Sequence, residues 1–113
     1  MPHRNWEIRI HDILTAVNSI QSYTKEMDFS SFKSDRRTVD AVIRNLIVIG
    51  EAASHMPEEI CQKYPEIPWY EMRGMRNFVV HEYFVVSDKI LWDTIHIDLK
   101  ELPKSLKRII KSG

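Results

Sequence analysis

The stretch between residues 36 and 55 constrains the fold more than any other part of the chain. Its apolar residues cover nearly the whole circumference of a helix: Val39, Val42, Ile43, Leu46, Ile47, Val48 and Ile49. A helix that is apolar almost all round cannot lie on a surface and has to be enclosed by other elements. We therefore predict a central helix that runs from about Arg36 to His55.

The other apolar residues also recur every three or four positions, which is the helical period. This spacing predicts a long first helix from about Trp6 to Met27 and a third main helix from about Trp69 to Phe84. Ser87 or Asp88 caps a fourth main helix. The inward residues of that helix are expected to be Leu91, Ile95, Leu99 and Leu102. The only β-prone run, residues 84–86, is too short for a strand.

The connections between these helices are short. Residues 28–34 break the apolar pattern, and Phe29 and Phe32 are expected to hold this loop against the core. A short helix is expected over about residues 57–64, because proline suits the first turn of a helix. Pro103 either kinks the fourth helix or starts a last short one. The predicted fold class is all-α: an up-and-down bundle of four main helices plus short helices, in a single domain over residues 1–113.

The charges of the chain cancel, since 16 basic residues face 16 acidic ones. The molecule as a whole therefore has no electrostatic preference for nucleic acid or for membranes. Residues 100–113 are the exception, with five Lys or Arg and one acidic residue. This segment is either a solvated helix face or a phosphate-binding patch.

The cellular compartment is indicated by what the sequence lacks. A single cysteine, Cys61, excludes an intrachain disulfide and a multi-cysteine zinc site, and it favours a reducing compartment. The first residues are too charged for the apolar core of a signal peptide, and no apolar run approaches the ~18 residues of a membrane span. We predict a cytoplasmic protein without a membrane partner.

Functional groups are concentrated in one segment, RGMRNFVVHEY, which runs from Arg73 to Tyr83. Gly74 falls inside the predicted third helix, where glycine costs about 1 kcal/mol relative to alanine, and so suggests a bend or a close approach of another backbone. On an ideal helix Arg76 and His81 are about 140° apart. They meet within one chain only if the helix bends. A second copy across a two-fold axis would bring two such pairs together more naturally.

The chemistry of this segment suits RNA cleavage. Arg76 can hold a phosphate with two parallel hydrogen bonds and stabilise the charge of the transition state. His81 can take a proton from a ribose 2′-hydroxyl or return one to the leaving oxygen. Two such pairs in one cleft would cleave RNA without a metal and leave a cyclic phosphate. Asn77 could orient the histidine or the substrate, and Tyr83 could stack on a base or donate to a phosphate.

Other polar residues support or compete with this interpretation. Glu51 interrupts the apolar run of the central helix, so its carboxylate either faces solvent or forms a salt bridge with Arg44, Arg73 or Arg76 that orients the motif. Two acid–histidine pairs resemble parts of metal sites: Glu51 with His55, and His96 with Asp98. Neither has a third ligand at a diagnostic spacing, so no metal site is predicted.

The ordered set of motifs resembles the HEPN superfamily and, more closely, the HepT-type toxins. The resemblance rests on IGEA at residues 49–52, PEIPW at 65–69, RGMRN at 73–77, HEYF at 81–84 and LW at 91–92. It implies a helical homodimer that places two Arg-x4-His motifs in a shared cleft and acts as an RNase without metal or cofactor. Arg76 and His81 occupy the catalytic positions, and Asn77 the polar position beside the arginine.

The same resemblance implies a partner and a control. The usual partner is a minimal nucleotidyltransferase that acts as antitoxin in a type VII-like pair and transfers AMP to the motif tyrosine, here Tyr83. We therefore expect a cytoplasmic, homodimeric RNase toxin with RNA, not DNA, as substrate. Arg73 and Glu51 are supporting residues. The alternatives are a non-catalytic module that binds a nucleotide or the nucleotidyltransferase, and a helical dimer whose polar motif only sets the interface.

Overall fold

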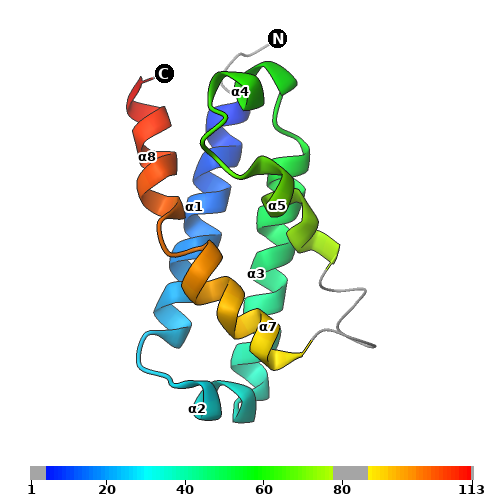
Figure 1. Cartoon of the computed structure of the whole chain (residues 1–113), viewed down its shortest axis with the longest axis vertical. Helices are drawn as coiled ribbons and strands as arrows, with labels where there is room; N and C mark the ends of the chain where they lie inside the picture. The colour runs from blue at the N-terminus through cyan, green and yellow to red at the C-terminus, as the bar shows by residue number, and fades with distance from the viewer. Residues whose placement is uncertain (1–4, 78–86, 113) are drawn as a thin grey trace.

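All regular elements are helical in the computed structural model, which describes residues 5–77 and 87–112 (Figure 1). The α-helices are α1 (Asn5–Thr24), α2 (Phe29–Ser34), α3 (Arg36–Ser54), α4 (Glu58–Lys63), α5 (Trp69–Gly74), α7 (Asp88–Asp93) and α8 (Leu102–Ser112). A 3₁₀ turn, η1 (Met75–Asn77), follows α5, and a π-helical turn, η2 (Thr94–Asp98), follows α7. The all-α fold class is therefore confirmed, with no strand within these residues.

The two long helices, α1 and α3, lie side by side and antiparallel along the long axis of the molecule (Figure 1). α8 packs on α1, while α5 and η1 pack on α3. The predicted central helix is confirmed almost to the residue. Its apolar surface is narrower than predicted, because Val48 is 40% exposed whereas Val42, Leu46 and Ile49 are fully buried. Among the described residues, no helix combines the length and the apolar character needed to cross a bilayer.

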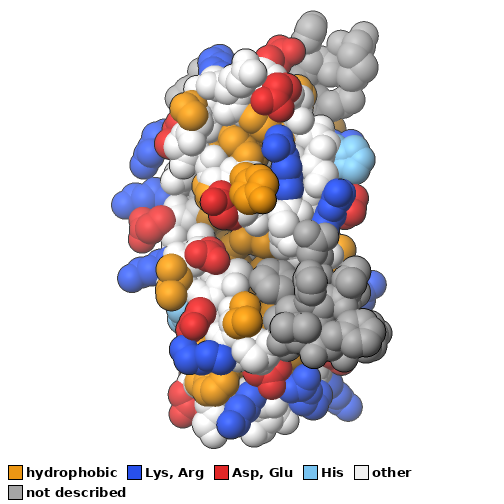
Figure 2. Space-filling model, turned by 45° about the vertical axis from the view of Figure 1, so that its right-hand side comes forward, with side chains coloured by type: hydrophobic (Ala, Val, Ile, Leu, Met, Phe, Trp, Pro, Cys, Tyr) orange, Lys and Arg blue, Asp and Glu red, His pale blue; other side chains and the backbone are white. Residues whose placement is uncertain are grey.

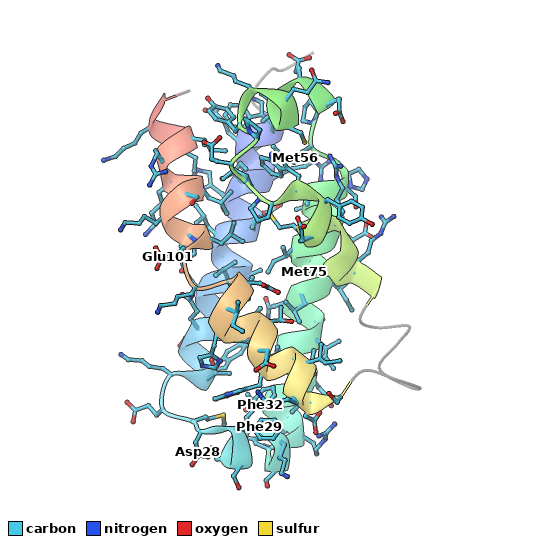
Figure 3. The ribbon with its side chains drawn as sticks, in the orientation of Figure 1. Asp28, Phe29, Phe32, Met56, Met75 and Glu101 are labelled. Carbon is cyan, nitrogen blue, oxygen red and sulfur yellow. The ribbon has the colours of Figure 1, made fainter. Side chains whose placement is uncertain are left out.

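The segment predicted as a loop at residues 28–34 contains a helix instead, and α1 ends at Thr24, three residues earlier than predicted. Asp28 begins α2: its carboxylate accepts from the Ser31 amide at 2.8 Å, and the Ser31 hydroxyl accepts from the Asp28 amide at 3.1 Å. Phe32 is fully buried, and its ring lies 5.2 Å from that of Trp92 in α7 (Figure 3). The expected packing of this segment against the core is thus confirmed, because Phe32 is buried in the core and Phe29 packs against it.

The third and fourth main helices are interrupted. α5 ends at Gly74 and continues as η1 to Asn77, and the rest of the predicted third helix lies outside the described residues. Ser87 caps α7, as predicted. The fourth helix then widens into η2, where the Leu99 amide donates to the Thr94 carbonyl, and Pro103 lies in the first turn of a separate α8. All four predicted inward residues are buried: Leu91, Ile95, Leu99 and Leu102.

Two capping carboxylates make the stability of the fold depend on pH in the acid range. Hydrogen bonds from Ser31 lower the pKa of Asp28, and hydrogen bonds from Thr38 lower the pKa of Asp35, which caps α3. A lowered pKa stabilises the fold above the ordinary value of about 3.9, and this contribution is lost as the pH falls through the lower folded-state pKa. The double variant Asp28→Asn, Asp35→Asn should therefore show a flatter loss of stability below about pH 4 in urea unfolding. If the double variant loses stability below about pH 4 as steeply as the original chain, these two carboxylates are not the source of the pH dependence.

Candidate functional site

α5 and η1 lie along the outer side of α3 and carry the two motif arginines. Trp69, Met72 and Met75 are spaced three residues apart and are all buried, so one side of this segment faces the core. The Trp69 indole also donates to the Tyr64 carbonyl at 3.0 Å and fixes the start of α5. The packing of this buried side directs Arg76 outward, where 47% of its side chain is exposed.

The backbone of η1 rests directly on α3 at Gly50. A Cβ atom built on Gly50 would lie 2.4 Å from the Arg76 nitrogen and 2.8 Å from the Arg76 Cβ, where real contacts are essentially never below 3.0 Å. The sequence predicted a bend or a close approach at Gly74. Among the described residues no backbone approaches Gly74 closely, because outside its chain neighbours and its own helix backbone no described atom lies within 4 Å of a Cβ at that position. Gly50 is the contact position that sequence reasoning missed, although a glycine inside an apolar helix often marks close packing.

Glu51 and Arg76 form an ion pair across this contact, with Oε2 and Nη1 3.6 Å apart. This confirms the predicted salt bridge of Glu51, with Arg76 as its partner among the three candidate arginines; that the pair orients the motif stays a prediction. The Glu51 side chain is 54% exposed, so the pair adds little to stability. It shows that the guanidinium of Arg76 lies beside the C-terminal part of α3.

Arg73 is held more firmly than Arg76. Its Nε donates to the Ala53 carbonyl at 3.4 Å, and its Nη2 donates to the Cys61 sulfur at 3.1 Å. Burial raises the pKa of the Cys61 thiol, and the nearby Arg73 charge only partly offsets this. Arg73 thus ties α5 to α3 and α4, and its role in the site stays a prediction.

Beside these arginines lies an open hollow of about 450 Å³, lined by Tyr70, Glu71, Arg73, Gly74 and Arg76. In Figure 2 the face around α5 carries hydrophobic, basic and acidic side chains close together. Asn77 is the last residue of η1, while His81 and Tyr83 lie outside the described residues, so their roles stay predictions. Of the six predicted site residues, the structure brings Glu51, Arg73 and Arg76 together.

The histidine of each acid–histidine pair considered as a metal site forms a hydrogen bond to the backbone carbonyl four residues before it. His55 Nδ1 lies 2.8 Å from the Glu51 carbonyl oxygen, and His96 Nδ1 lies 2.9 Å from that of Trp92. Within residues 5–77 and 87–112, no three His, Cys, Asp or Glu side chains are grouped to hold a metal ion.

The Glu51–Arg76 pair predicts a separation of activity from stability. In Glu51→Gln the carboxylate is replaced by an amide of the same shape, so Arg76 loses its charged partner but no packing. RNA cleavage should fall about 2- to 5-fold, and the free energy of unfolding should change by less than about 1 kcal/mol, the range of an exposed ion pair. Initial cleavage rates and urea titrations on the same preparation measure both. Unfolding of this variant under native conditions would refute an orienting role.

Comparison with known proteins places the chain in a family. A family model described as ribonuclease HepT-like matches residues 13–109. The Methanocaldococcus jannaschii protein named "Putative RNase MJ0125" is 40% identical over 111 residues, which are 98% of this chain and 96% of that protein. The "Probable ribonuclease HepT" of Thermococcus cleftensis is 38% identical over 90% of this chain and 93% of its own length. No solved structure gave a significant match. The chain belongs to the HepT-like ribonuclease family.

Proposed function

We propose that this protein is the RNase toxin of a type VII-like toxin–antitoxin pair and cleaves RNA without a metal ion. The observation that carries the proposal is the placement of Arg76: its backbone is set against Gly50, its guanidinium is held by Glu51, and it borders an open hollow. Membership of a ribonuclease family supports the substrate class. The proposal includes an up-and-down arrangement of the helices and a place in the cytoplasm.

Each residue of the motif has a step in the proposed reaction. His81 takes the proton of a ribose 2′-hydroxyl, whose oxygen attacks the neighbouring phosphorus while the bond to the 5′-oxygen of the next nucleotide breaks. Arg76 stabilises the added negative charge on the phosphoryl oxygens. A proton returned to the 5′-oxygen completes the step and leaves a 2′,3′-cyclic phosphate. Asn77 orients His81 or the substrate, and a homodimer supplies two copies of the motif to one cleft.

The proposed control is covalent. A minimal nucleotidyltransferase, acting as antitoxin, would bind the toxin and direct the Tyr83 phenol oxygen at the α-phosphorus of ATP. A Tyr83–AMP ester would form and pyrophosphate would leave. The added phosphate would repel the RNA backbone beside the catalytic pair.

Mass spectrometry and a cleavage assay test the proposal together. The protein is prepared alone and with a minimal nucleotidyltransferase and ATP, treated with EDTA, and incubated with single-stranded RNA. We expect cleavage to cyclic phosphate ends by the unmodified form only, with AMP-sized mass steps on Tyr83 in the other preparation. Absence of both cleavage and modification would contradict the toxin function.

A second candidate function is a non-catalytic module that binds a nucleotide or the nucleotidyltransferase. It is favoured by the charge balance, because Glu51 and Glu71 match Arg73 and Arg76 around the hollow and the net charge of the whole chain is zero. A nonspecific RNase would gain from a positive surface. Nucleotide binding without RNA cleavage by the purified protein would favour this module.

A further inference from the structure

The most exposed large hydrophobic side chain in the described part of the chain is Tyr70, at 80%. It lines the same hollow as Arg73, Gly74 and Arg76. An aromatic ring at such exposure contributes little to the core, which is closed on this segment by Trp69 and Met72. Its place beside the proposed catalytic arginine is therefore unexplained by folding.

Gly74 is the second observation. It follows Tyr70 by four residues, so on α5 the two positions are neighbours on one side of the helix. Its backbone does not have a positive φ, and outside its chain neighbours and its own helix backbone a Cβ there would meet no described atom within 4 Å. Neither a special backbone conformation nor contact with the described residues accounts for this glycine. What it provides is a part of the hollow's lining, one helical turn from Tyr70, that is free of side chain.

We propose that Tyr70 and the bare surface of Gly74 form a stacking platform for one base of single-stranded RNA, next to the phosphate held by Arg76. This site deepens the function proposed above and rests on it. A phenol ring stacks on any base and tolerates any sequence. Because the charges around the hollow balance, stacking rather than phosphate attraction supplies most of the affinity at this position.

The test measures RNA binding by the full chain carrying His81→Ala, which keeps the RNA intact. Fluorescence anisotropy with a labelled single-stranded oligoribonucleotide gives the dissociation constant. In this background, Tyr70→Ala should weaken binding about 5- to 150-fold, the range of one lost base stack, while Tyr70→Phe should stay close to the original. Tyr23→Ala is the matched control, because Tyr23 is a 45% exposed tyrosine of α1 that does not line the hollow. It should bind as the original does.

RNA with single abasic positions identifies the base that stacks on Tyr70. Replacing one nucleotide at a time by an abasic ribose should reveal one position whose loss weakens binding as much as Tyr70→Ala. The two changes combined should weaken it no further, because each removes the same contact. Gly74→Leu should also weaken binding without lowering the unfolding midpoint, since leucine favours a helix and would fill the space beside the ring.

The outcomes separate this platform from the proposed activity. The platform would be overturned by any of three results. Tyr70→Ala could bind RNA as tightly as the background chain, its loss of affinity could add to that of every abasic position, or the chain could fail to bind RNA. Weaker binding that follows dissociation of the protein in sedimentation would also overturn it and make Tyr70 a protein contact. The chain with His81 is assayed for cleavage separately. If Tyr70→Ala and one abasic position are non-additive but the chain with His81 does not cleave RNA, only the proposed RNase activity is contradicted. If that chain cleaves RNA but the two changes are additive, only the platform is contradicted.

Discussion

Gly50→Ala should reduce RNA cleavage about 100-fold, because a displacement of roughly 1 Å at a catalytic group costs about that much. The new Cβ would lie 2.4 Å from the Arg76 nitrogen, and ordinary contact begins at 3.4 Å, so η1 has to move outward by the difference of about 1 Å. That movement carries Arg76 away from Glu51. The free energy of unfolding should fall by about 1–2 kcal/mol, since overpacking outweighs the helical preference of alanine.

Gly74→Ala is the stability control for this result. It lies in the same segment, yet its Cβ meets open space among the described residues, so the free energy of unfolding should rise by up to about 1 kcal/mol. Urea titrations compare the stability of the two variants directly. Cleavage by Gly50→Ala is assayed under conditions in which this variant is fully folded. Unchanged stability and activity in Gly50→Ala would show that η1 does not rest on α3.

Arg76→Ala and His81→Ala should each abolish growth inhibition and lower cleavage by purified protein at least about 100-fold. Arg76 would lose its contact with the charged phosphoryl group, and His81 its proton transfer. The Arg76 side chain is about half exposed, so its removal should change the free energy of unfolding by less than about 1 kcal/mol. Both variants should stay folded and keep the oligomeric state of the original.

Two further arginine variants sharpen the test. Arg76→Lys keeps the charge but loses the parallel pair of hydrogen bonds, so it should recover only part of the activity. Arg44→Ala removes an exposed arginine of α3 that does not line the hollow, and it should cleave at the original rate. Toxicity that survives in both Arg76→Ala and His81→Ala would exclude this mechanism. A shift of the dimer equilibrium alone in His81→Ala would favour a structural role for the motif.

The helices were predictable where a local signal is strong. The apolar period placed α3 almost to the residue, and the Ser87 cap placed the start of α7. The errors lie where side-chain caps and tertiary packing override that period. The reciprocal hydrogen bonds of Asp28 and Ser31 turn a polar stretch into α2, and α5 gives way to η1 where the backbone rests against Gly50 of α3.

The sequence by itself determined the helical class, the central helix and the segment that carries the arginines, because spacing along one chain encodes these locally. It left three partners open for Glu51 and directed attention to Gly74. Only the tertiary structure decided that Arg76 is the partner and that Gly50 is the contact glycine. The Glu51–Arg76 pair and the Gly50 contact both depend on how closely α3 and η1 approach each other. That distance is set by the buried side chains of the whole core rather than by any local pattern.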